Sequence, residues 1–119
     1  PSSEANYNAY LPQPGCEMGL NRAESIPVGR FVPNAWGLHD MAGNINELCW
    51  DYYAFFTADA VTDPTGPPTG KTRVFRGGSF KNYAAHCHSA SRQQGIPQQP
   101  LDMVGLRLVR TATGSGGGR

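Results

Sequence analysis

Hydrophobic and polar residues alternate in only a few short stretches of this chain, and these stretches predict its strands. Residues 73–76 alternate polar with apolar side chains, as a half-buried strand does. Residues 84–92 and 104–110 also alternate, the latter well enough for a closing strand. Residues 43–53 hold the densest aromatic content and favour a strand that leaves a tight turn. A further short strand is predicted at residues 28–32.

The remaining segments show neither the period of a strand nor the period of a helix, so we predict that they are irregular. Residues 1–27 are expected to form an extended arm, and residues 57–71, with three prolines and two glycines, a long surface loop. Residues 93–103 predict a polar loop rich in Gln and Pro, and residues 111–119 a flexible tail. No stretch has the length and period of a helix. We therefore expect one core, residues 28–110, between an arm and a tail.

Composition indicates a loop-rich globular domain with a small aromatic core. The chain has 15 Gly, 10 Pro and 10% aromatic residues, and its 10 Lys and Arg nearly balance 9 Asp and Glu. A nearly neutral, aromatic-rich chain is not typical of disorder. It offers no basic stripe for nucleic acid and no apolar run long enough to span a membrane. We expect six aromatic residues to pack in the core rather than to form a binding surface for a ligand. They are Trp36, Trp50, Tyr52, Tyr53, Phe55 and Phe56.

The strongest candidate for chemistry is the segment from Asp40 to Glu47. The two carboxylates bracket Gly43, which permits a sharp turn, and Asn44 and Asn46 add amide oxygens. Such a loop can aim several oxygens at one centre, which suits Ca²⁺, although the spacing does not follow the EF-hand register. A turn stabilised by Asx hydrogen bonds, without an ion, is the alternative reading of these residue types.

Four motifs follow one another within residues 33–107: PNAWGL at 33–38, DMAGNINE at 40–47, RGGSF at 76–80 with a downstream Arg92, and GLR at 105–107. In this order they resemble the formylglycine-generating enzyme, or sulfatase-modifying factor, domain family. The resemblance implies an irregular α+β fold of the C-type-lectin-like kind, with short strands, few helices and long loops.

The resemblance also implies a metal site and bears on catalysis. It implies one Ca²⁺ with ligands from the side chains of Asp40 and Glu47 and the carbonyls of Gly43 and Ile45. Members that oxidise a sulfatase cysteine hold Cu⁺ with two cysteines, whose positions fall here on Asn82 and Cys87. An amide oxygen does not replace a thiolate on soft Cu⁺. We therefore expect no copper catalysis, with Cys87 a weak catalytic candidate that is expected to be a small buried hydrophobe.

Three functions of different classes fit these observations. The first is a non-catalytic module that binds a ligand or protein. Its polar residues 81–102 resemble the segment that retroelements diversify in one branch of the family, and the candidate ligand-binding residues are Asn82, Tyr83, His86, His88, Gln93 and Gln94. The second is a formylglycine-generating oxidase or a sulfoxide-synthase-type subunit. The third is a structural subunit of an extracellular assembly.

Expectations about partners and remaining residues follow from the same motifs. Residues 1–32 lack the segments with which these domains generally begin, so we expect another chain or domain to supply an N-terminal half. A protein or glycan ligand, no nucleic acid, and a secreted or cell-surface location are also expected. His39 is expected to be an ordinary surface or turn residue. Buried pairing with Asp51 or Asp102 is expected for Arg76, Arg92 and Arg107.

Overall fold

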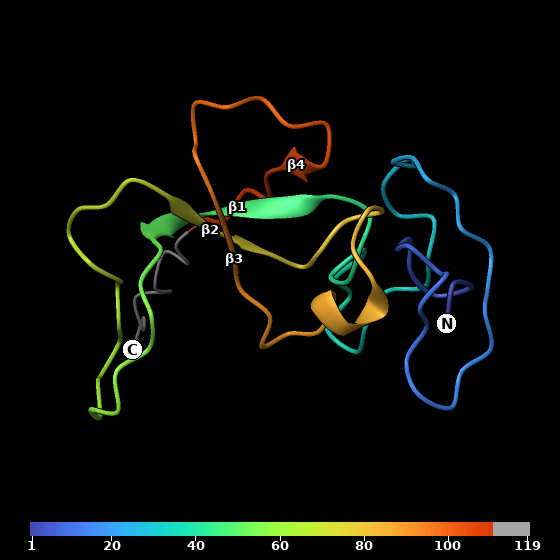
Figure 1. Ribbon diagram of the computed structural model, residues 1–119, viewed down its shortest axis with the longest axis horizontal. Coiled ribbons are helices and arrows are strands. Elements are labelled where there is room, and N and C mark those ends of the chain that lie inside the picture. Colours follow the sequence, from blue (N-terminus) through green and yellow to red (C-terminus); the bar gives the residue numbers. More distant parts are fainter. Residues whose placement is uncertain (111–119) are drawn as a thin grey trace, which may run out of the picture.

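The fold is a four-stranded sheet with long irregular connections. The structure, a computed structural model, describes residues 1–110, so the tail expected at 111–119 lies outside the described residues. The strands are β1 (Asn46–Tyr52), β2 (Arg73–Arg76), β3 (Gln93–Gly95) and β4 (Val104–Gly105). They lie in the order β3-β2-β1-β4; β2 is antiparallel to both β3 and β1, and β4 is parallel to β1 (Figure 1).

Helical structure is almost absent, as the sequence predicts. Within residues 1–110 the only helix is the 3₁₀ turn η1 (Ala84–His86). The described residues therefore contain nothing with the length and apolarity of a membrane-spanning helix.

The two longest strands lie where the sequence predicted strands, although β2 does not alternate between buried and exposed positions. β2 has the predicted bounds, and β1 begins three residues after the start of the predicted stretch. In β2, Val74 and Phe75 are buried while the flanking arginines are half-buried. Glu47 lies opposite Arg76 and Leu48 opposite Phe75, so Glu47 and Arg76 share one face, and the register becomes irregular between Leu48 and Tyr52.

The strand predicted at residues 28–32 is wrong, because this segment turns instead. Gly29 has φ of 75° and donates its N–H to the Asp40 carboxylate at 2.6 Å. Val28 and Val32 are exposed. The Gly29 N–H donates to a side chain across the turn, so it is not available for a hydrogen bond to a neighbouring strand.

The strand predicted at residues 84–92 is also wrong. Cys87 N–H donates to the Ala84 carbonyl at 3.1 Å and closes the 3₁₀ turn. Ala84 and Cys87 are the buried pair here, and Tyr7 and Ala9 cover them. Their spacing of three is the period of a helical turn rather than of a strand.

Pairing, rather than local pattern, determines β3 and β4. β3 lies in the segment predicted to be a polar loop, where Gln94 pairs with Val74 and Gly95 with Arg73. Gly95 lacks a side chain, which lets the Phe75 ring lie directly against it. The closing strand predicted at residues 104–110 shortens to two residues, because only these pair with β1.

The core combines polar side chains with three buried aromatic residues, Tyr7, Phe75 and Phe80, which are not the aromatic residues predicted to form it. The largest fully buried side chains are Val74, Asn6, Asn46 and Ser79. The rings of Trp36, Trp50, Phe55 and Phe56 are instead between 82 and 87% exposed. Trp50 lies in β1, which no helix within residues 1–110 covers, and the other three rings lie on irregular segments.

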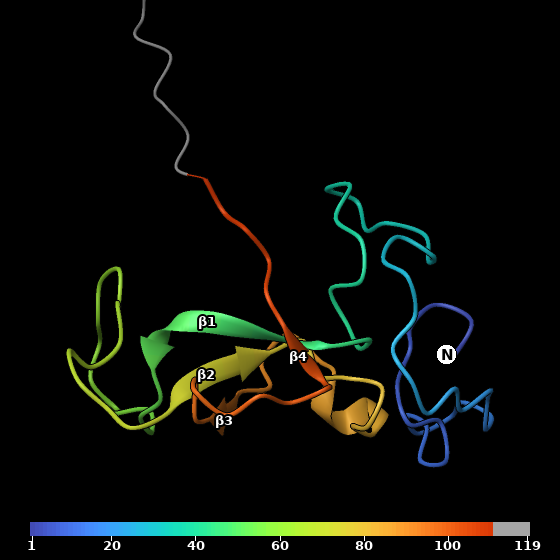
Figure 2. The same ribbon diagram turned by 90° about the horizontal axis from the view of Figure 1, so that it is seen from above.

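The N-terminal arm is irregular but packs into the core. Residues 1–27 contain no strand or helix, only isolated bridges from Asn6 to Gly43 and from Asn8 to Tyr83. Tyr7 and Ala9 are buried beside η1. Two perpendicular views place the arm at the η1 end of the sheet and the loop between β1 and β2 at the opposite end (Figures 1 and 2).

Candidate functional site

The loop before β1 is clamped at Gly43. This glycine has φ of 82°, and a Cβ atom there would collide with the backbone carbonyl of Asn6. Its N–H donates to the Gly77 carbonyl at 2.8 Å, and the next N–H, of Asn44, donates to the Asn6 carbonyl at 2.7 Å. The absence of a side chain at this position therefore allows three chain segments to approach closely, and it also allows the turn.

Asn44 joins this loop to the N-terminal arm. Its side chain is 3% exposed, and its Oδ1 accepts hydrogen bonds from Ile26 N–H at 2.9 Å and Asn6 Nδ2 at 3.1 Å. Its Nδ2 donates to the Ile26 carbonyl at 3.0 Å. With its amide oxygen used in this way, Asn44 has a structural role rather than the role of a metal ligand.

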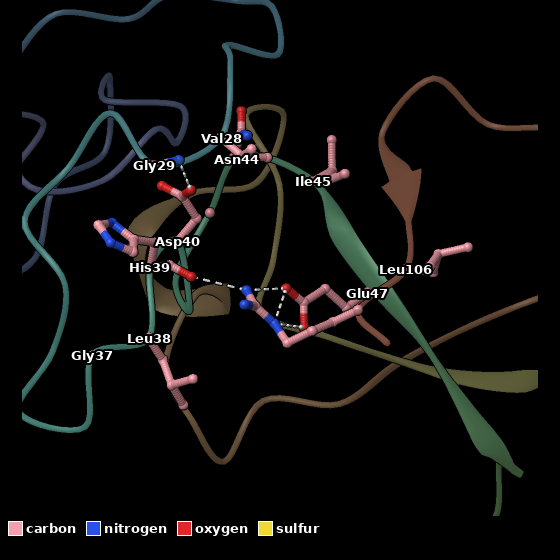
Figure 3. A pocket seen from close by; sticks show the side chains of 12 residues that line it. Val28, Gly29, Gly37, Leu38, His39, Asp40, Asn44, Ile45, Glu47 and Leu106 are labelled. Atoms are coloured by element: carbon pink, nitrogen blue, oxygen red, sulfur yellow. Dashed lines mark hydrogen bonds and ion pairs between the residues drawn. The ribbon is translucent and has the colours of Figure 1, made fainter. Parts of the chain in front are cut away.

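All four residues that the resemblance assigned to a metal line one cavity. The cavity has a volume of about 390 Å³ and opens where the loop before β1, the turn at residues 28–29 and the segment after β4 meet (Figure 3). Its lining includes the predicted ligands Asp40, Gly43, Ile45 and Glu47. The structure therefore brings together residues that are up to seven positions apart in sequence.

The two carboxylates in this cavity are turned to different partners (Figure 3). Asp40, with φ of 54°, accepts the Gly29 N–H through Oδ2, while its Oδ1 is buried without a hydrogen-bond partner among the described residues. Glu47 accepts hydrogen bonds from Arg107 Nε at 2.8 and 3.0 Å. Arg107 Nη2 also donates to the His39 carbonyl at 2.9 Å, so one guanidinium spans the cavity. The hydrogen bond to Glu47 raises the pKa of Arg107.

The oxygen atoms of the residues that line the cavity are suitable ligands for a hard cation. Carboxylate and carbonyl oxygens are the ligands that Ca²⁺ prefers, and the buried Asp40 Oδ1 is an acceptor without a donor. Residues 1–110 contain no cluster of three or more His, Cys, Asp or Glu side chains placed to hold a metal. A cation here would need both carboxylates, backbone carbonyls and a shift of Arg107. The sequence placed Arg107 in a family motif but gave no sign that it reaches Glu47.

Cys87 lies in the core rather than at a surface. It packs with Tyr7, Ala9 and Ala84, and burial raises the pKa of its thiol to about 11. Its sulfur lies so close to Gly78 that a Cβ atom at that glycine would stand 2.6 Å from it. The raised pKa favours the protonated thiol at neutral pH, which is the weaker nucleophile.

The six candidate ligand-binding residues do not form one exposed set. Asn82 and Gln93 are half-buried and touch each other at 3.4 Å, and Asn82 Oδ1 accepts hydrogen bonds from Ser79 N–H and Oγ at 2.9 and 2.8 Å. Gln94 is exposed and bonds Thr72 across β2 and β3. The three on or beside η1, all exposed, are Tyr83, His86 and His88.

The arginines of the motifs have other partners than expected. Arg76 and Arg92 each donate one N–H to a backbone carbonyl, at 2.7 and 3.0 Å, and Arg107 pairs with a glutamate in β1. The expected pairing with Asp51 or Asp102 is therefore wrong. Irregular segments leave carbonyls without strand or helix partners, and these carbonyls accept the guanidinium N–H groups.

Comparison with known proteins gives consistent matches. The family model described as sulfatase-modifying factor enzyme 1-like domain matches residues 2–112. The chain is 35% identical over 89 residues to formylglycine-generating enzyme from Bos taurus, covering 71% of this chain and 24% of that enzyme. It is 37% identical over 93 residues to the enzyme of the same name from Thermomonospora curvata, covering 71% of this chain and 31% of that one.

A solved structure shares the fold. Treponema denticola variable protein 1 matches with a TM-score of 0.73 and 31% sequence identity, covering 88% of this chain and 35% of that chain. The chain thus spans between 24 and 35% of the length of these three relatives.

Proposed function

The chain belongs to the family of sulfatase-modifying factor enzyme 1-like domains, and from this membership we propose that it is a non-catalytic, calcium-stabilised binding module. The module takes the C-type-lectin-like variant of the fold and binds a protein or glycan ligand at a secreted or cell-surface location. The exposed residues around η1, which are Tyr83, His86 and His88, provide contacts for that ligand.

The observation that carries the non-catalytic proposal is the state of Asn82 and Cys87. The oxidising members of the family need two thiolates at these positions, and here one is an amide that holds the turn at Ser79. The other is a buried thiol with a pKa of about 11. The alternatives are a formylglycine-generating oxidase, the name of the bovine relative, a sulfoxide-synthase-type subunit, and a structural subunit of an extracellular assembly.

Calcium is proposed to bind in the cavity beside β1. Asp40 and Glu47 would hold it with their carboxylates, and Gly43 and Ile45 with their carbonyls. The ion would supply positive charge that neutralises two acidic groups and cross-links the loop to the strand. The buried Asp40 Oδ1 supports this proposal, because it has no donor within the described structure.

The test of calcium is thermal unfolding of the whole chain in excess CaCl₂ and in EDTA. Binding at about one hundred times Kd stabilises by about 2.7 kcal/mol, so EDTA should lower Tm by roughly several degrees. Asp40→Asn should abolish the difference, whereas the matched control Glu17→Gln, at an exposed acid, should keep it. Equal Tm values in CaCl₂ and EDTA for the native chain would contradict the calcium proposal.

The test of the non-catalytic proposal is titration of the reduced chain with Cu⁺. We expect no tight stoichiometric binding that depends on Cys87. Stoichiometric Cu⁺ binding that Cys87→Ser removes, while Cys16→Ser leaves it intact, would support the oxidase instead.

A further inference from the structure

A second and larger cavity lies between the β1–β2 pair and the loop that connects them. We call it the loop cavity; its volume is about 700 Å³. Val74, only 2% exposed, contributes its floor, and Phe55, Phe56 and Val61 contribute apolar walls. None of the metal-site residues and none of the six candidate ligand-binding residues lines it.

Positive charge faces this cavity from two positions. Arg76 and Arg92 line it together with one carboxylate, Asp51, which leaves an excess of one positive charge. Within residues 1–110 each of these guanidiniums makes a single hydrogen bond, from Nη1 to a backbone carbonyl. A guanidinium has five N–H donors, so most of these donors remain for a ligand.

Arg92 is held in position by aromatic rings. Its guanidinium lies 5.0 Å from the ring centroid of Tyr53 and 4.3 Å from that of Phe56. This stacking fixes the direction of its N–H groups before a ligand arrives, which reduces the entropy lost on binding. The geometry suits a carboxylate, which a guanidinium binds through two parallel hydrogen bonds.

The apolar surface extends beyond what a small acid would cover. Phe55 and Phe56 are 85 and 82% exposed, and Val61 is 66% exposed. Exposed apolar patches next to charged groups mark protein interaction sites. The relatives are about three to four times longer than this chain's match to them, so their matched part folds beside much additional polypeptide.

We propose that the loop cavity binds a polypeptide segment in which carboxylates alternate with aromatic or aliphatic side chains, supplied from outside residues 1–119. The carboxylates pair with Arg76 and Arg92. The apolar side chains cover Phe55, Phe56 and Val61. This site does not depend on calcium or on the residues around η1.

The probe is a short fluorescein-labelled peptide in which glutamate alternates with phenylalanine and leucine, measured by fluorescence polarisation with the whole chain. A counterpart with glutamine in place of glutamate tests the charge. We expect saturable binding of the glutamate peptide and binding of the glutamine peptide that is at least about tenfold weaker, since each lost charged hydrogen bond costs more than 1.4 kcal/mol.

Variants locate the binding. Arg92→Gln and, independently, Phe55→Ser should each weaken it by about tenfold or more. The matched controls Arg30→Gln and Val32→Ser, at exposed positions outside the cavity, should leave it unchanged. Phe55 is exposed, so its replacement leaves the core intact, and unchanged Tm identifies a folded variant.

Five results would overturn the proposal. They are no binding of the glutamate peptide to the folded chain, equal binding of the glutamine peptide, and equal binding by the Phe55→Ser variant. The fourth is tighter binding of 3-phenylpropionate than of the glutamate peptide in a displacement titration, because a small organic acid would then be the occupant. Sedimentation velocity adds a check: a dimer that Phe55→Ser dissociates would identify a second copy as the occupant and also overturn it.

Discussion

Replacing Asn44 tests whether a polar network holds the fold together. Asn44→Ala removes three buried hydrogen bonds, at 2.9, 3.0 and 3.1 Å, which join the loop before β1 to Ile26 and Asn6. Each such bond contributes about 1 kcal/mol net, so the three together contribute about 3 kcal/mol. Alanine at φ of 66° adds about 1 kcal/mol. We therefore expect a loss of roughly 3–5 kcal/mol.

The assay is equilibrium unfolding in urea, followed by far-UV circular dichroism. A chain of 119 residues has a free energy of unfolding of about 6–18 kcal/mol, so the variant should still fold in water. Asn44→Gly provides the matched comparison, because it loses the same hydrogen bonds but accepts positive φ. It should be about 1 kcal/mol more stable than Asn44→Ala.

Two results would refute this reasoning. A loss below about 1 kcal/mol for Asn44→Ala would mean that water replaces the network at little cost. If the Asn44→Gly variant is no more stable than the Asn44→Ala variant, then the backbone at residue 44 relaxes and its positive φ carries no strain.

Two further predictions concern Gly43 and Cys87. Gly43→Ala should destabilise by more than about 3 kcal/mol, because its Cβ would meet the Asn6 backbone, whereas Gly15→Ala, also at φ of 82° but with no atom within 4 Å, should cost about 1–2 kcal/mol in urea unfolding. Equal losses would contradict the close approach. Burial raises the pKa of Cys87 from 9.0 to about 11, so the folded state keeps a proton that the unfolded state releases. The contribution of Cys87 to the free energy of unfolding should therefore be constant below about pH 9 and fall as pH rises towards 11, so Cys87→Ala should reduce the fall of stability in this range. A fall of the same size in Cys87→Ala would contradict it.

Local pattern predicted the parts of the fold that form locally. The sequence predicted a strand at residues 73–76, although Val74 and Phe75 are both buried rather than alternating, and Gly43 predicted the turn before β1. β3 and β4 were missed or overextended because three and two residues carry too little pattern, and their pairing with β2 and β1 decides them.

The buried polar contacts and the site contacts depend on distant residues. Asn6 and Asn44 are 38 positions apart and Glu47 and Arg107 are 60 apart, so no window of sequence contains either pair. Residue types placed Asp40 and Glu47 in one loop, and the structure places both at one cavity. The sequence could not indicate that Arg107, which follows β4, forms an ion pair with Glu47. Counting aromatic residues also misled, since rings such as Trp50 are exposed where no layer covers the sheet.

The short outer strands have a consequence for self-association. β3 and β4 flank the sheet with three and two residues, and each ends before it offers a long row of free N–H and C=O groups. A foreign strand therefore finds little backbone to extend the sheet in the manner of a fibril. Side chains rather than free strand edges are therefore available to bind a partner. Exposed aromatic rings can then contact a partner without an adjacent long strand edge that would promote aggregation.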